Sequence, residues 1–219
     1  MKKIMKAARA LALAAPLAAS AVTPTVSWTS WANVGSGNLT QNAQTITVTY
    51  TGDTIGLDYS SSIYDVPSSF TNAEVTNTPG SNGTILMTGG NATVNNFHFS
   101  QAVIDPYIDV FSVGQGGVPV SFVFLNGSLT ILSQGTGHWG GGTLTNSGLV
   151  VTGFEGNGLL KFSGSYTDIS FVTPNSEYYY GATVGAAITA EVPEPETYAT
   201  LMAGLGLLGV LARRRNAAS

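Results

Sequence analysis

Acidic side chains are the residues of this chain best suited to chemistry. Two carboxyl groups about 5–10 Å apart across a cleft carry out glycoside hydrolysis. Glu155 is the best single candidate, because the glycines of segment 153–158 would let a ligand approach the backbone closely. A solvated acid in a glycine-rich turn is the alternative interpretation. Between residues 22 and 190 the carboxylates are Asp53, Asp58, Asp65, Glu74, Asp105, Asp109, Glu155, Asp168 and Glu177.

Oxygen ligands for a cation occur together in segment 105–109. Asp105 and Asp109 are the candidate metal ligands, and Ca²⁺ is the ion that such oxygens favour. The spacing of an EF-hand loop is absent, and aspartates that form turns are the alternative. The chain has no cysteine, which excludes thiol catalysis, cysteine-bound zinc and iron–sulfur clusters. We therefore expect no cofactor, with Ca²⁺ as the alternative.

Aromatic side chains near glycines offer a second kind of chemistry, the stacking of sugar rings. His138 and Trp139 lie in the glycine-rich run 135–142, and Tyr178 and Tyr180 are predicted to share one face of a strand. These four are the candidate glycan-binding residues. A Trp139 that closes one end of the core is the alternative. The other histidine, His98, is predicted to lie on a strand surface opposite its two phenylalanine neighbours.

The charge balance excludes some partners. The whole chain has a net charge of −4, but most of its basic residues lie near the two ends. Between residues 22 and 190, one lysine faces nine acids, a net charge of −8. One cation cannot displace many counterions from a phosphate backbone, which excludes nucleic-acid binding. Anionic lipid headgroups are disfavoured for the same reason, whereas a neutral glycan, a divalent cation or another protein fits.

Residues 22–190 predict an all-β domain. Ile46, Val48 and Tyr50 alternate with threonines, and the same pattern resumes at residues 55–59, so we predict a hairpin. A second hairpin is predicted where Asn126 and Gly127 separate alternating residues 118–124 from 129–131. Other predicted strands cover Val26 and Trp28 and residues 84–88, 93–99, 107–113, 148–151, 159–163, 168–172 and 178–190.

Many short strands punctuated by Gly, Asn and Ser favour a jelly-roll-like β-sandwich. No amphipathic helix is predicted between residues 22 and 190. We expect this segment to fold as one ectodomain.

The N-terminus has the organisation of a secretory signal peptide. Four basic residues precede the apolar run 10–19, and Ala19, Ser20 and Ala21 form an A-x-A-like cleavage site. We therefore predict a signal peptide over residues 1–21 and a mature chain that begins at Val22. The predicted route is export through the secretory pathway.

The C-terminus has the organisation of a membrane anchor. A proline-bearing linker over 191–196 precedes the uncharged apolar run 197–212, predicted to be a transmembrane helix. Under the positive-inside bias, the basic tail 213–219 stays in the cytoplasm and the preceding domain lies outside.

The order of these C-terminal parts resembles the PEP-CTERM sorting signal of exported proteins in Gram-negative bacteria that form exopolysaccharide. The resemblance implies that an exosortase-type enzyme recognises the Pro-Glu-Pro segment and removes the helix. The segment from Ser112 to Val184 is also similar to β-rich ectodomains that precede this signal, most of them uncharacterised. The residues that carry the sorting-signal resemblance are Val192, Pro193, Glu194, Pro195, Arg213, Arg214 and Arg215.

We therefore expect an exported, non-enzymatic protein of the cell surface or extracellular matrix that contacts exopolysaccharide. The expected partners are the exosortase-type enzyme, extracellular polysaccharide and, through the C-terminal helix, the inner membrane. One alternative is an exported polysaccharide hydrolase that uses paired carboxylates. Another is a structural surface protein without a ligand.

Overall fold

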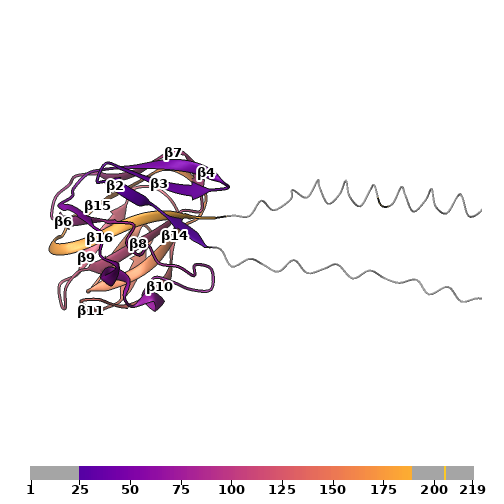
Figure 1. Ribbon diagram of the computed structural model, residues 1–219. Helices are drawn as coiled ribbons and strands as arrows, with labels where there is room; N and C mark the ends of the chain where they lie inside the picture. The colour runs from indigo at the N-terminus through magenta and orange to yellow at the C-terminus, as the bar shows by residue number, and fades with distance from the viewer. Residues whose placement is uncertain (1–24, 189–204, 206–219) are drawn as a thin grey trace, which may run out of the picture.

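The computed structural model describes residues 25–188 and Leu205 (Figure 1). Residues 25–188 are all-β, with two short 3₁₀ helices, η1 (Ser61–Tyr64) and η2 (Pro67–Ser69), and no α-helix. The predicted signal peptide, linker and basic tail lie outside the described residues. The predicted transmembrane helix also lies outside them, apart from Leu205.

Two eight-stranded antiparallel sheets face each other, as in a β-sandwich. Sheet A has the order β11-β10-β14-β8-β16-β6-β5, with β1 paired to β16, and sheet B the order β12-β13-β9-β15-β7-β4-β3-β2. The strands of sheet A are β1 (Val26–Trp28), β5 (Gly56–Asp58), β6 (Thr84–Gly89), β8 (Tyr107–Val113), β10 (Leu129–Gly137), β11 (Gly140–Gly141), β14 (Gly156–Phe162) and β16 (Ser176–Ala187). Those of sheet B are β2 (Ser30–Asn33), β3 (Ser36–Gln41), β4 (Gln44–Thr51), β7 (Asn95–Ile104), β9 (Val120–Phe124), β12 (Leu144–Ser147), β13 (Val150–Gly153) and β15 (Ser165–Val172).

The core between the sheets follows from the alternation of apolar and polar residues. In β4, Ile46, Val48 and Tyr50 are buried, and the threonines between them lie at the surface or are partly exposed. Phe97 and Phe99 are likewise buried in β7, with His98 exposed between them, as predicted. Apolar burial of this extent is the main favourable term in folding.

Both predicted hairpins are wrong. Strand β4 pairs with β3 and β7 in sheet B, whereas β5 pairs with β6 in sheet A. Asn95 directs this crossing, because its side chain accepts hydrogen bonds from Tyr50 Oη and Asp53 N at 3.0 and 2.7 Å. The turn after residue 51 therefore joins the two sheets.

The Asn126–Gly127 turn also joins the two sheets instead of closing a hairpin. It follows β9 of sheet B and precedes β10 of sheet A. The Asn126 side chain donates to Asp168 O at 2.8 Å and accepts from Ser170 N at 2.9 Å, which fixes the turn to β15. A Cβ atom on Gly127 would lie 2.7 Å from the Phe162 ring, so glycine is required for this close approach.

Segment 59–83, which includes η1 and η2, covers part of the outer face of sheet A. Ile63, Tyr64 and Phe70 from this segment pack with Leu86 and Phe111 of the sheet. A second cluster unites Val75 with residues of β1, β8 and β14. Sheet A is thus buried on both faces along part of β8, which agrees with the burial of all seven β8 residues.

The two ends of the domain lie side by side. Val26 pairs with Ala187, and Ile188 N donates to Thr25 O at 2.8 Å. Strand β16 begins at Ser176, at the other end of sheet A (Figure 1).

We predict that residues 22–190 fold on their own as a monomer dominated by strand. The two sheets supply a core without help from the segment after Ile188. Far-ultraviolet circular dichroism of this fragment should show a strand signature, and sedimentation should give a monomer mass. A strong helical signal, or precipitation unless the C-terminal tail is retained, would contradict the prediction.

Candidate functional site

A surface cavity with a volume of about 370 Å³ lies at the end of sheet A where β16 begins. Strand β8 contributes one lining residue, the β10–β11 turn another and the β13–β14 turn a third, and the first residues of β16 complete the wall. We call it the acidic cleft. Its lining residues are Ser112, Trp139, Glu155, Glu177, Tyr178 and Tyr179.

Two β-bulges shape the acidic cleft. In β8, the register with β14 shifts between the pairs Gly156–Val113 and Gly158–Val110. In β16, the register with β6 shifts between Ser176 and Tyr180, so that three residues of β16 oppose one of β6. Bulges re-aim side chains and are common beside functional sites. Here they point Ser112 and residues 177–179 at one place.

Two of the five non-glycine residues with positive φ among residues 25–188 lie at the same place. Ser112 and Glu155 have φ angles of 51° and 63°, which non-glycine residues seldom adopt. Ser112 Oγ donates to Glu155 Oε1 at 2.6 Å, and Ser112 N donates to Asn157 Oδ1 at 2.9 Å. Strained residues of this kind persist where the surrounding structure holds them and often lie at functional sites.

Glu177 is the most buried acid of the cleft, with 7% of its surface exposed. Gly114 N donates to its Oε2 at 2.8 Å, while Oε1 has no hydrogen-bond partner within residues 25–188. Burial raises the pKa of Glu177 to about 7, the hydrogen bond from Gly114 opposes this rise, and the negative charge of Glu155 adds to it. Glu177 therefore holds a proton in part of the molecules at neutral pH.

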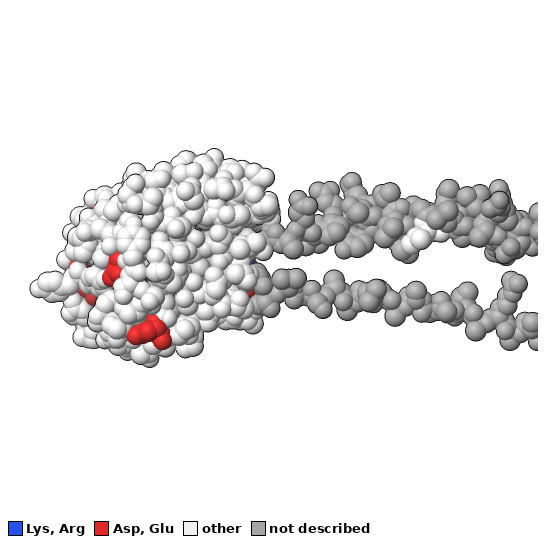
Figure 2. Space-filling view, viewed as in Figure 1, with Lys and Arg blue, Asp and Glu red and all other residues white. Residues whose placement is uncertain are grey.

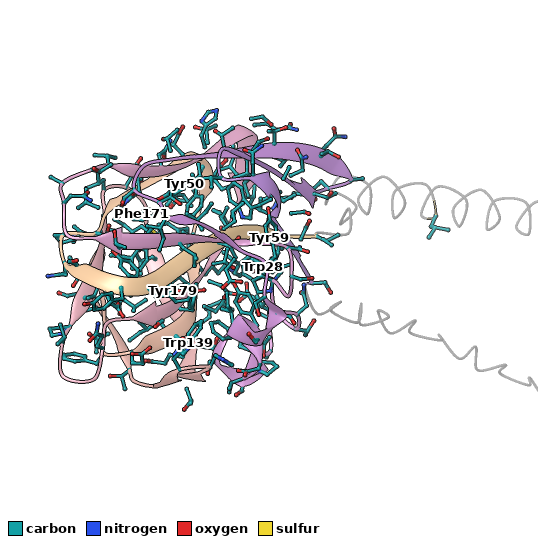
Figure 3. The ribbon with its side chains drawn as sticks, turned by 60° about the vertical axis from the view of Figure 1, so that its left-hand side comes forward. Trp28, Tyr50, Tyr59, Trp139, Phe171 and Tyr179 are labelled. Carbon is teal, nitrogen blue, oxygen red and sulfur yellow. The ribbon has the colours of Figure 1, made fainter. Side chains whose placement is uncertain are left out.

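Aromatic rings form the rest of the wall. Trp139 and Tyr179, both labelled in Figure 3, meet edge to face with ring centroids 4.9 Å apart. The centroid of each ring lies 5.8 Å from that of Phe111. Tyr179 also donates a hydrogen bond to Asp58. Trp139 keeps 49% of its surface exposed and Tyr178 keeps 88%. Exposed rings of this size are suited to packing against the apolar face of a ligand.

A second cavity of similar volume adjoins the acidic cleft. It is lined by Thr88, Gln115 and Ser176, and it shares Glu177 and Tyr178 with the first. Tyr178 thus stands between two hollows, an arrangement with room for more than one unit of a chain-like ligand.

The surface of the domain as a whole carries few charges. Figure 2 shows an almost uncharged face, on which the visible charged patches are mainly acidic. Lys161, the one lysine or arginine among residues 25–188, pairs with Glu74. Burial raises the pKa of Glu74, but hydrogen bonds from Lys161 and Tyr107 outweigh this effect and lower it overall.

The structure brings together three of the residues singled out from sequence, namely Glu155, Trp139 and Tyr178. His138 does not line the cleft. Its ring packs edge-on against Trp139, with centroids 4.9 Å apart, and its Nδ1 lies 2.7 Å from Asp65 Oδ2. His138 thus fixes the turn that presents Trp139 to the cleft.

The prediction that Tyr178 and Tyr180 share one face is wrong. Tyr180 is fully buried in the core between the sheets, where its ring packs edge-on against Phe122. The bulge in β16 inserts extra residues between Ser176 and Tyr180, which changes the alternation of faces. Tyr180 is therefore unavailable to a glycan.

The structure does not bring Asp105 and Asp109 together as a calcium site. Asp105 Oδ1 accepts a hydrogen bond from Gly164 N at 2.7 Å in a turn, whereas Asp109 is buried beneath segment 59–83. Burial raises the pKa of Asp109 well above its usual range, which opposes the ionised form that Ca²⁺ needs. Residues 25–188 contain no group of three or more His, Asp or Glu side chains placed to hold a metal ion.

The sequence analysis did not single out Ser112 and Glu177 as site residues. One pattern could have indicated Glu177, because an acid directly before three tyrosines is unusual in a strand of small apolar residues. Ser112 carried no such pattern, since its role depends on the bulge in β8.

Comparison with known proteins identifies the C-terminal segment. Residues 191–215 match the PEP-CTERM protein-sorting motif, in agreement with the predicted resemblance. No curated protein and no solved structure matches the chain.

The fold and the motif together define an all-β exported protein with a PEP-CTERM sorting segment. The motif implies export and sorting by an exosortase. Among the residues that the structure describes, no helix has the length and apolar character needed to cross a membrane.

Proposed function

We propose that this protein is a non-enzymatic component of the cell surface or extracellular matrix that binds exopolysaccharide through the acidic cleft. The observation that carries the proposal is the convergence of Trp139, Tyr178 and Tyr179 with two carboxylates in one cavity. Sugar rings have apolar C–H faces that pack on aromatic rings and hydroxyl edges that donate to carboxylates. The cleft offers both kinds of partner.

Truncation of Trp139 tests this proposal. In the full chain, we expect Trp139→Ala to weaken binding to oligosaccharides about 3- to 10-fold, because one stacking contact is worth roughly 0.5–1.5 kcal/mol beyond its buried area. The half-exposed ring should contribute little to folding, so the melting temperature should change by only a few degrees. A glycan array followed by calorimetric titration would measure the binding.

Leu125→Ala is the matched control, because Leu125 is equally exposed and lies in the β9–β10 connection. It should leave glycan binding unchanged. A large fall in melting temperature for Trp139→Ala would instead make Trp139 a core residue. Unchanged binding with an unchanged melting temperature would favour the structural protein without a ligand.

We further propose that the sorting segment anchors the protein in the inner membrane until an exosortase removes it and releases the domain to the surface or matrix. Support comes from the match over residues 191–215, which includes the Pro-Glu-Pro residues. In a host that carries the enzyme, the mature protein should lack Arg213–Arg215 when its mass is measured. A variant with alanine in place of both Pro193 and Pro195 should keep Arg213–Arg215, because the enzyme would no longer recognise the segment. Intact arginines on all of the wild-type protein would contradict this proposal.

Polysaccharide hydrolysis is the second candidate function, because Glu155 and Glu177 line the same cleft. Glu177 would give its proton to the glycosidic oxygen as the C–O bond breaks. Glu155 would take a proton from the water whose oxygen bonds to the anomeric carbon. Release of reducing ends by the full chain, abolished in Glu177→Gln, would support this candidate. Binding without any release would favour the non-enzymatic function.

A further inference from the structure

We propose that the acidic cleft selects sugars with a free amine, so that its ligand is a polysaccharide containing glucosamine-type units. This inference rests on the proposed function, because it names the class of glycan that the cleft would bind. It follows from the charge of the cleft, from the free oxygens of its two carboxylates and from the position of its aromatic rings.

The charge of the cleft has no internal counterion. Glu155 and Glu177 both line the cavity, and neither takes part in an ion pair within residues 25–188. Lys161 pairs with Glu74 and lies over the ring of Tyr107, at the end of β8 remote from Ser112. A uronic acid would be repelled by this cleft, and a neutral sugar would leave its charge uncompensated. An ammonium group would compensate it.

Each carboxylate is held by one oxygen and leaves the other free. Glu177 Oε2 accepts from Gly114 N, and Glu155 Oε1 accepts from Ser112 Oγ. The remaining oxygens, Glu177 Oε1 and Glu155 Oε2, accept no hydrogen bond from residues 25–188. An ammonium group has three N–H donors and no acceptor, so it can donate to both free oxygens. An N-acetyl group has a single N–H donor and no charge.

The aromatic residues strengthen the same preference. The faces of tryptophan and tyrosine rings attract cations, tryptophan most strongly, and Trp139 borders the cleft beside Tyr178 and Tyr179. A sugar ring packed on one of these rings would place an amine substituent within reach of the carboxylates. Asp58 and Asp65 are the other acids nearby. Asp58 accepts a hydrogen bond from Tyr179, which lines the cleft, and Asp65 is hydrogen-bonded to His138, the neighbour of Trp139.

The protonation of Glu177 provides a second measurement of amine binding, which does not depend on affinity. Because burial raises the pKa of this group to about 7, an ammonium bound beside it would favour the ionised form and release a proton. A neutral sugar would release none. Proton release can be measured by titration calorimetry in buffers with different ionisation enthalpies.

The test compares two tetrasaccharides, β-1,4-linked glucosamine and its fully N-acetylated counterpart, by calorimetry on the purified full chain at about pH 6.5. We expect the glucosamine form to bind at least about tenfold more tightly, since its ammonium group pairs with the Glu155 carboxylate and favours the ionised form of Glu177. Glu177→Gln and Glu155→Gln should each remove most of this preference. Asp168→Asn, which changes an exposed carboxylate outside the cleft, should retain it.

The outcomes separate this inference from the proposed function. Equal affinity for both tetrasaccharides would overturn amine selection and leave glycan binding by the cleft intact. Binding of neither would overturn both. A glucosamine preference that survives in both glutamine variants would also overturn the inference, because it would reflect general attraction between a polycation and an acidic domain.

Discussion

Truncating Phe171 to alanine is expected to lower the free energy of unfolding by about 3–5 kcal/mol. Phe171 is fully buried in β15, and its ring lies 5.3–5.8 Å from those of Phe97, Phe122 and Phe124. Removing it leaves a cavity bordered by rigid rings that cannot close over the space. The melting temperature should fall by roughly 10 °C, since each kcal/mol shifts a domain of this size by about 2–4 °C.

Val94→Ala is the control for this truncation. Val94 precedes β7 and keeps 51% of its surface exposed, so its loss should change stability by less than about 0.5 kcal/mol. Chemical denaturation of both variants, followed by tryptophan fluorescence, would measure the difference. Similar losses in the two variants would show that the phenylalanine cluster is not the centre of the core.

Replacing Asp109 with asparagine is expected to stabilise the protein increasingly as the pH rises. Neither carboxyl oxygen of Asp109 has a hydrogen-bond partner within residues 25–188, and burial raises the pKa of this group well above its usual range. The folded state therefore holds a proton that the unfolded state releases at about pH 4. Above that pH, the free energy of unfolding of the wild type falls by up to about 1.4 kcal/mol per pH unit until the folded pKa is reached.

Asparagine has a similar shape and no proton to hold, so the variant should lack this fall. Denaturation at a series of pH values between about 4 and 8 would give the difference in the free energy of unfolding between the two proteins. The contribution of Glu177 is common to both and cancels in this difference. Asp168→Asn is the control, for which the change in stability with rising pH should have the opposite sign. Burial raises the pKa of Asp168, but hydrogen bonds from Asn96 and His98 outweigh it and lower the pKa, so this variant should lose stability above about pH 4. Parallel curves for Asp109→Asn and wild type would mean that Asp109 is solvated.

The all-β fold was predictable because several strands, among them β4 and β9, carry their own alternation of buried and more exposed residues. Strands β4 and β8 lie where the pattern of apolar residues predicted them. The pairing of strands was not predictable from the same signals. The turns at Gly52 and Asn126 look like hairpin turns, but groups distant in sequence direct them from one sheet to the other. These groups are the Asn95 side chain and the backbone of β15.

The part of the candidate site that lies in exposed, glycine-rich turns was predictable from the sequence. Trp139 and Glu155 lie in glycine-rich turns, and both line the cleft. The role of Ser112 and the burial of Tyr180 depend on bulges, which change which strand face each residue occupies. The local sequence pattern does not indicate where these bulges occur. A period of two cannot predict which residues lie on either side of such a shift.

The adjacency of Thr25 and Ile188 bears on the proposed attachment and release of the domain. Strand β16 begins beside the cleft and ends at Ala187, so the cleft lies roughly 30 Å from the last residues of the domain. If the domain is attached through the segment after Ile188, as proposed above, the cleft would lie at the opposite end of β16 from the attachment. Cleavage within residues 191–215 would remove no strand from either sheet, because β16 ends at Ala187. The released protein would keep the same fold and the same binding surface.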